Sequence, residues 1–125
     1  MTILDTSVLI DSLTGPRQSG AALLRAVDRG EQLVIPTLVL YEWLRGPRLR
    51  EELADQETLF PTIQAIHFGP LEAAQAAELY RAVGRPRARE MDLAIAACAL
   101  VREAELWTLN PADFRDIPGL RLARF

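Results

Sequence analysis

Four acidic residues of this 125-residue chain lie where an α/β protein gathers groups for chemistry. Each of them follows or starts an element that the apolar pattern predicts, although they are far apart in the sequence. The four are Asp5, Glu42, Asp92 and Asp113. Asp5 ends the apolar stretch that begins at Thr2, and ligands of open α/β sheets bind beyond the carboxyl ends of the strands. Asp5 is therefore the residue that the other three acids must be able to reach.

Several carboxylates packed close together cannot all stay ionised unless a positive charge compensates them. Mg²⁺ or Mn²⁺ supplies that charge, because these hard ions prefer oxygen ligands. Such an ion lowers the pKa of a bound water and stabilises a leaving oxygen. The chain has no lysine, and its one histidine, His67, lies between Ile66 and Phe68 as a core or edge residue would. With no paired nucleophile and base, the expected reaction is phosphodiester hydrolysis by a metal-activated water.

Each acid also has a simpler explanation. Asp5 could cap the helix that follows it, and Asp92 could favour the positive end of its helix dipole, an effect of ~0.3–1 kcal/mol. Asp113 could be a turn residue, and Glu42 could be a surface acid within an apolar run. Four such coincidences at matching element ends are less expected than one shared site.

The elements that must position these acids alternate along the chain. Apolar runs predict strands at residues 2–4, 33–35, 63–68, 106–109 and 120–123. Helical spacing and breaker residues predict helices between them, the clearest at residues 87–103. Strands separated by helices favour parallel pairing with right-handed crossovers. The expected fold is α/β, a three-layer α/β/α sandwich with a Rossmann-like, mainly parallel sheet of about five short strands, in a single domain over residues 1–125.

Composition sets limits on the class of protein. One cysteine, Cys98, excludes an intrachain disulfide. The net charge of −3 argues against nonspecific binding of nucleic acid, although the distribution of charge matters more than its sum. No basic, apolar leader is visible, and no apolar run approaches the roughly 20 residues that span a bilayer. We therefore expect a cytoplasmic protein with no membrane association.

Four motifs in this order and spacing resemble those of the PIN domain, and within it the VapC-type toxins of bacterial toxin–antitoxin pairs. The motifs are Leu4-Asp-Thr-Ser-Val-Leu-Ile-Asp11, Tyr41-Glu-Trp-Leu-Arg-Gly46, Asp92-Leu-Ala-Ile-Ala-Ala-Cys-Ala-Leu100 and Thr108-Leu-Asn-Pro-Ala-Asp-Phe114. The resemblance implies an endoribonuclease that depends on Mg²⁺ or Mn²⁺. By position, Asp5, Glu42 and Asp92 are its core acids. The fourth acid is expected at Asp113, with Asn110 as the competing position.

The resemblance also implies neighbours and partners for the site. Thr6, Ser7, Thr108 and Asn110 are expected to surround the acids and orient carboxylates or metal-bound waters. Five arginines near the acids are candidates for RNA phosphate contacts, the alternative being a solvated surface: Arg45, Arg48, Arg85, Arg87 and Arg89. The expected partners are an RNA substrate, a cognate antitoxin protein and a second copy of the chain in a homodimer.

Other classes of protein place different demands on the same positions. A phosphotransferase of the haloacid-dehalogenase kind needs a second aspartate two residues after the first, where this chain has Ser7. A receiver domain needs a lysine, which the chain lacks. Two alternatives stay open: a non-catalytic binding module with the PIN fold, and a PIN nuclease of RNA processing without an antitoxin.

Overall fold

Three short parallel strands form the centre of the molecule in a computed structural model that describes all residues 1–125. They are β1 (Thr2–Leu4), β2 (Leu33–Val34) and β3 (Glu105–Trp107), in the order β2-β1-β3. Ile3 pairs with Val34 on one side and with Leu106 on the other. The central strand β1 is completely buried, which explains why it is a continuous apolar run and not an alternating one.

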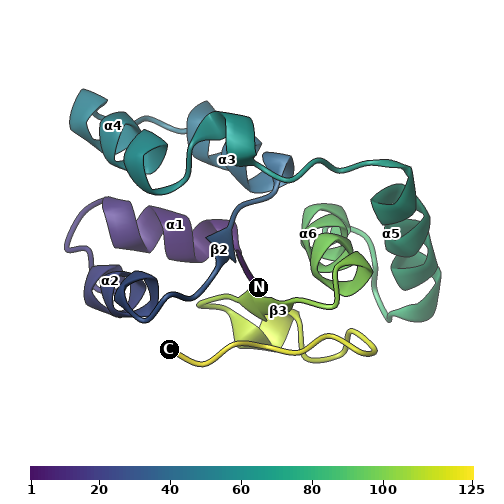
Figure 1. Cartoon of the computed structure of the whole chain (residues 1–125). Coiled ribbons are helices and arrows are strands. Elements are labelled where there is room, and N and C mark those ends of the chain that lie inside the picture. The colour runs from purple at the N-terminus through teal and green to yellow at the C-terminus, as the bar shows by residue number, and fades with distance from the viewer.

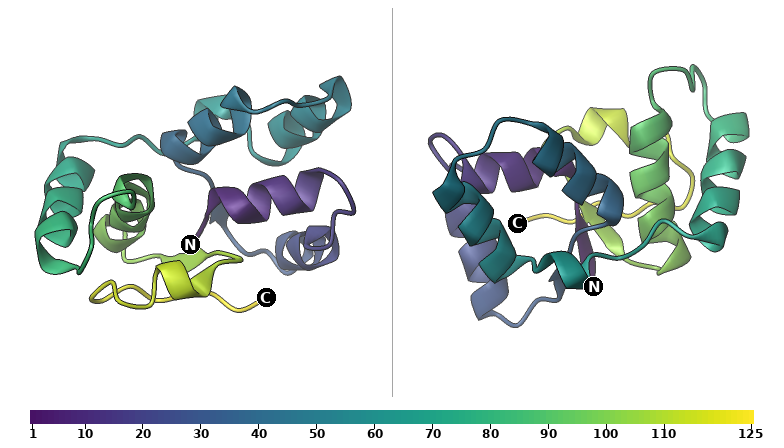
Figure 2. Two further views of the ribbon diagram at one scale, coloured as in Figure 1. Left: turned by 180° about the vertical axis from the view of Figure 1, so that it is seen from behind. Right: turned by 90° about the horizontal axis from the view of Figure 1, so that it is seen from above.

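Six helices surround this sheet. In chain order they are α1 (Thr6–Leu13), α2 (Gly20–Asp28), α3 (Thr37–Arg45), α4 (Arg50–Leu59), α5 (Pro70–Ala82) and α6 (Glu90–Val101). Both α1 and α6 contact β1, and they lie on opposite sides of it in Figures 1 and 2. Helices α2, α3 and α4 pack on α1, whereas α5 packs on α6 (Figure 1). None of the helices is both long and apolar enough to cross a membrane.

Helix α6 is buried nearly all round because it lies between the sheet, α3 and α5. Its fully buried residues are Leu93 and Ile95 through Ala99. Four of these six are alanine or cysteine, and small side chains allow three neighbours to approach one helix closely. A helix that is apolar on every face belongs in a core. This burial fixes α6, and with it Asp92 in its first turn, relative to β1.

The prediction of about five strands was wrong at both edges of the sheet. Residues 63–68 form a 3-10 turn (Thr62–Gln64) and then a single parallel bridge from Ile66 to Pro36. Ile66 N–H donates to the Ile35 carbonyl and Thr37 N–H donates to the Ile66 carbonyl, and the pairing ends there because α3 starts at Thr37. Residues 120–123 likewise make one bridge, Leu122 to Leu106. The parallel direction of the pairing is as predicted.

An ion pair at the α5–α6 contact stabilises the side of the sheet that carries Asp92. Glu72 is buried, accepts the Gly69 backbone N–H at 3.1 Å and pairs with Arg102 at 2.6 Å. Burial by itself would raise the pKa of Glu72, but hydrogen bonds from backbone N–H groups and from Arg102 lower it overall. The ionised form is therefore favoured in the folded state.

We expect Glu72→Gln to lower the free energy of unfolding at pH 7 by about 1–3 kcal/mol, since Arg102 loses its charged partner. A lowered carboxyl pKa gives stability that is complete above the unfolded value of 4.5 and is lost as pH falls through the folded value. The difference between wild type and variant should therefore shrink towards pH 3. Urea denaturation at pH 7 and pH 3 measures it, and an equal difference at both would contradict the assignment.

Candidate functional site

Asp5 lies directly after β1 and turns the chain into α1. Its backbone N–H donates to the Trp107 carbonyl at 2.9 Å, which continues the β1–β3 pairing by one residue. Its side chain caps no backbone N–H of α1, so the capping explanation does not account for it. The residue is only 5% exposed, and Oδ2 accepts hydroxyl groups from Ser7 at 2.9 Å and Thr108 at 2.7 Å. Oδ1 has no hydrogen-bond partner within the chain and is free to bind a ligand.

The hydroxyl groups of Ser7 and Thr108, which donate to Asp5, are oriented by backbone N–H donors from the segment after β3. Leu109 N–H donates to Ser7 Oγ at 3.1 Å, and Asn110 N–H donates to Thr108 Oγ1 at 3.0 Å. Because each hydroxyl oxygen already accepts from the backbone, its own hydrogen is directed to the carboxylate. This network ties the carboxyl ends of β1 and β3 together.

Glu42 reaches the same edge from α3, which follows β2 and packs on α1. Its carboxylate accepts the hydroxyl of Thr6, the first residue of α1. The other oxygen pairs with Arg45 at 3.4 Å, one turn further along α3. The Glu42 side chain is 19% exposed, so it is shielded on one side and open to solvent on the other.

Asp92 is the acid whose pKa is changed by the charges of the other three. Burial, followed by the negative charges of Asp5, Asp113 and Glu42, raises its pKa to about 6, while Arg89 opposes this rise. Charges shift a pKa by this route only when they lie close to the group. The structure thus brings Asp5, Glu42 and Asp113 near Asp92, although the first and last of these acids are more than a hundred residues apart in the sequence.

The fourth acid, Asp113, ends a 3-10 turn, η2 (Pro111–Asp113), and its side chain is exposed. Asn110 precedes this turn, and its amide side chain has no hydrogen bond within the chain, while its carbonyl accepts Asp113 N–H. Of these two competing positions, only Asp113 adds charge beside Asp92. Asn110 instead closes the turn that presents Asp113.

A divalent metal is consistent with the chemistry of this donor set, because carboxylate oxygens suit Mg²⁺ and Mn²⁺. The Asp5 oxygen that accepts no hydrogen bond and the raised pKa of Asp92 point the same way. No three acidic, histidine or cysteine side chains are grouped closely enough to hold an ion as they stand. A cavity of about 540 Å³ lies between α1, α2 and α4, and none of the four acids lines it.

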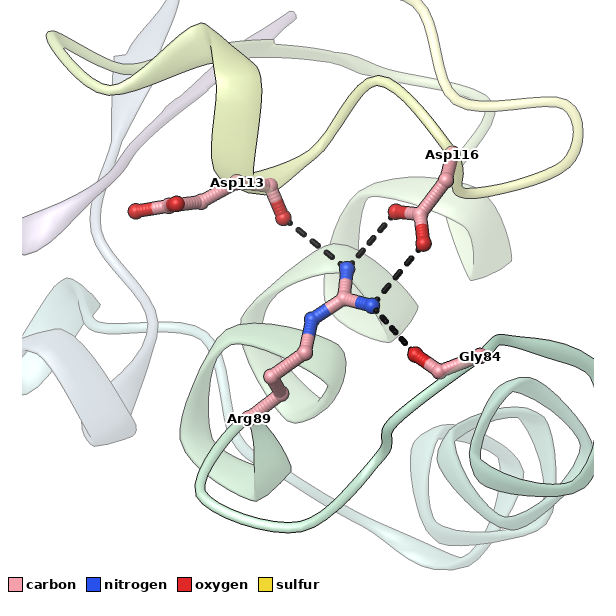
Figure 3. Close-up of polar contacts among 4 residues, drawn as sticks. All are labelled: Gly84, Arg89, Asp113 and Asp116. Carbon is pink, nitrogen blue, oxygen red and sulfur yellow. Dashed lines mark hydrogen bonds and ion pairs between the residues drawn. The ribbon is translucent and has the colours of Figure 1, made fainter.

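The five arginines of the sequence prediction have different surroundings. Arg85 and Arg87 are exposed and make no hydrogen bond within the chain. Arg45 pairs with Glu42, and Arg48 stacks over the Trp43 ring at 4.3 Å. Arg89 alone has all its terminal N–H groups engaged, with acceptors on Gly84, Asp113 and Asp116 (Figure 3). Sequence reasoning missed Asp116, because nothing in its local pattern signals a partner 27 residues away.

Comparison with known proteins places this arrangement in a family. The family described as "PIN domain" matches residues 2–120, which confirms the resemblance seen in the motifs. "Ribonuclease VapC19" from Mycobacterium tuberculosis is 28% identical over 128 residues, covering 97% of this chain and 98% of that protein.

Solved structures share the fold at lower sequence identity. VapBC from Salmonella typhimurium, bound to DNA, has a TM-score of 0.74 at 24% identity and covers 98% of this chain and 96% of that chain. VapBC2 from Rickettsia felis, bound to a promoter DNA fragment, has a TM-score of 0.72 at 20% identity with the same coverage of both chains. FitAcB from Neisseria gonorrhoeae has a TM-score of 0.72 at 17% identity, covering 98% of this chain and 97% of that chain.

Proposed function

This chain belongs to the PIN-domain family and is related to the VapC ribonucleases, and we propose that it is an endoribonuclease that requires Mg²⁺ or Mn²⁺. The observation that carries the proposal is the raised pKa of Asp92, caused by burial and then by the charges of Asp5, Asp113 and Glu42. Three carboxylates whose charges help to raise the pKa of a fourth, at one edge of a sheet, would form a site for a cation.

The four acids would hold the ion, and the neighbouring hydroxyl groups would fix how they do so. A bound divalent ion supplies a water of lowered pKa and offsets charge on a phosphodiester. Ser7 and Thr108 donate to one oxygen of Asp5 and leave the other free. Thr6 holds one oxygen of Glu42 in the same way. Hydroxyl groups that hydrogen-bond a metal-binding carboxylate restrict it to one rotamer and so preorganise the set of ligands.

RNA would reach this edge across its exposed arginines. Arg85 and Arg87 lie in the loop before α6, close in sequence to Asp92, and their guanidinium groups are free to contact phosphates. Arg45 could exchange its long 3.4 Å contact with Glu42 for a phosphate. Arg48 is partly exposed and could likewise exchange its bond to the Pro47 carbonyl. These contacts are independent of base identity, so they position the strand and do not select a sequence.

We further propose that the protein acts as the toxin of a type II toxin–antitoxin pair, with an antitoxin protein and a second copy of the chain as partners. The support is the relationship to VapC19 and the likeness in fold to chains from VapBC complexes. A non-catalytic PIN module and an RNA-processing nuclease without an antitoxin are the alternatives. Coexpression with the neighbouring reading frame tests the pairing: growth arrest by this chain alone, relieved by the neighbour, is the expected result.

The enzymatic proposal is tested by adding and removing the metal. Purified protein should cleave single-stranded RNA with Mn²⁺ or Mg²⁺ and stop when a chelator is added in excess. Mn²⁺ at 100 times its dissociation constant should also stabilise the fold by about 2.7 kcal/mol, which raises the melting temperature by several degrees. Ca²⁺ controls for a nonspecific ionic effect on cleavage. Intact RNA together with an unchanged melting temperature would support the non-catalytic alternative.

A further inference from the structure

Arg89 connects three segments of the chain at the proposed site. Its Nη2 donates to the main-chain carbonyl of Asp113 at 3.0 Å and to Asp116 Oδ1 at 2.7 Å. Its Nη1 donates to Asp116 Oδ2 at 2.9 Å and to the Gly84 carbonyl at 3.1 Å. Figure 3 shows all four contacts converging on one guanidinium group. Arg89 itself directly precedes α6, which carries Asp92 in its first turn.

We propose that Arg89 is a positioning residue that holds Asp113 next to Asp92, and not a contact for RNA. The inference rests on the proposed function, because it concerns the same four acids. Arg89 binds the backbone of Asp113 and leaves its carboxylate free, and Figure 3 shows that carboxylate pointing away from the guanidinium group. The four terminal N–H groups of Arg89 are all used, so a phosphate would have to displace protein acceptors.

The turn that presents Asp113 needs such support from outside. It is one turn of 3-10 helix, and its own hydrogen bonds are local ones, Asp113 N–H to Asn110 and Phe114 N–H to Pro111. Phe114 anchors the turn in the core, but Asp113 and Asp116 on either side are exposed. The bidentate ion pair between Arg89 and Asp116 connects the segment that follows this turn to the start of α6. Paired N–H bonds to one carboxylate fix direction as well as distance.

The loop before α6 is held by the same side chain. Arg85 and Ala88 adopt left-handed backbone conformations, with φ of 55° and 65°. Residues other than glycine remain in such conformations only where surrounding contacts enforce them. The bond from Arg89 to the Gly84 carbonyl closes this loop. The Arg89 side chain is 20% exposed, so its ion pair is partly shielded from water.

Arg89→Lys, Asp116→Ala and the double variant test the proposal. Lysine keeps the positive charge but cannot form the two-pronged pair, which separates geometry from charge. The first measurement is amide hydrogen exchange of residues 110–117 in metal-free protein, expected to be about 10-fold faster or more in all three variants. The matched control is Arg115→Ala, an exposed arginine beside Asp116 with no hydrogen bond in the chain, which should leave exchange unchanged.

The second measurement is the Mn²⁺ dissociation constant by calorimetry together with the kinetics of RNA cleavage. Both single variants should weaken Mn²⁺ binding by about 10- to 100-fold, and the double variant should be no worse than either. KM for RNA at saturating Mn²⁺ should stay unchanged, while kcat at limiting Mn²⁺ falls. A raised KM for RNA in Arg89→Lys with unchanged Mn²⁺ affinity would mean that Arg89 contacts phosphate in the wild type, which overturns the proposal.

Two further outcomes separate this inference from the proposed function. Wild-type exchange and Mn²⁺ affinity in Arg89→Lys would show that charge alone suffices, and the positioning role would be overturned. If wild-type protein binds no Mn²⁺, the proposed function fails, and the exchange comparison alone then decides whether Arg89 holds the turn. Unchanged exchange in both single variants would overturn it in that case too.

Discussion

Asp5→Asn is expected to lower the rate of RNA cleavage by on the order of 10³-fold, because metal-assisted stabilisation is worth several kcal/mol and each 1.36 kcal/mol is a factor of ten. The substitution removes the charge of the acid at the centre of the proposed site. It also replaces one oxygen by an NH₂ group. The hydroxyls of Ser7 and Thr108 would direct the amide oxygen towards themselves and turn the NH₂ group to the position of Oδ1. The metal would then face an NH₂ group, which donates hydrogen bonds and has no lone pair available to bind the ion.

Steady-state cleavage of a fluorescent RNA with Mn²⁺ measures this effect. Asp11→Asn is the matched control, because Asp11 is an aspartate of α1, the helix that follows Asp5, and accepts the Ser19 backbone N–H at 2.8 Å, a bond the asparagine oxygen can keep. Circular dichroism should show both variants folded. Undiminished cleavage by Asp5→Asn would remove the basis for the metal site.

Asp92→Asn is expected to have two effects of opposite direction. It should abolish metal-dependent cleavage, and it should stabilise the metal-free protein at neutral pH. The pKa of Asp92 is raised from 3.8 to about 6, so the folded state disfavours its ionised form. Stability is therefore lost as pH rises from about 4 through 6, and asparagine escapes this loss. Asp92 is partly exposed, so solvent screening limits the gain to about 1 kcal/mol above pH 6.5.

Urea denaturation in chelator at pH 4 and pH 7.5 measures the gain, which should be present only at the higher pH. With excess Mn²⁺ the order should reverse, since only the wild type gains binding energy. Glu90→Gln is the matched control: it removes an exposed acid of the same helix turn that has no hydrogen bond in the chain. A metal-free Asp92→Asn protein that is less stable than wild type at pH 7.5 would contradict the raised pKa of Asp92.

The edges of the sheet show where prediction of the fold stops. The central strands β1 and β3 were predictable because buried parallel strands are continuous apolar runs. Residues 63–68 have a similar composition, yet only Ile66 pairs. Whether an edge segment forms a strand depends on the conformation of its neighbour, and the chain beside Ile66 turns into α3 at Thr37. The sequence of residues 63–68 alone therefore does not show whether they form a strand.

The sequence by itself determined the family and the parallel direction of the strands, and it pointed to four candidate acids, of which Asp5 stands out most clearly. These features are local, since apolar runs, breakers and short motifs encode burial and turns directly. Only the tertiary structure decided that Arg89 pairs with Asp116. It also decided that the charges of three other carboxylates contribute to the raised pKa of Asp92. Both depend on distances between segments that are far apart in the chain. Such distances follow from how the whole core packs, because a charge acts through space and not along the sequence.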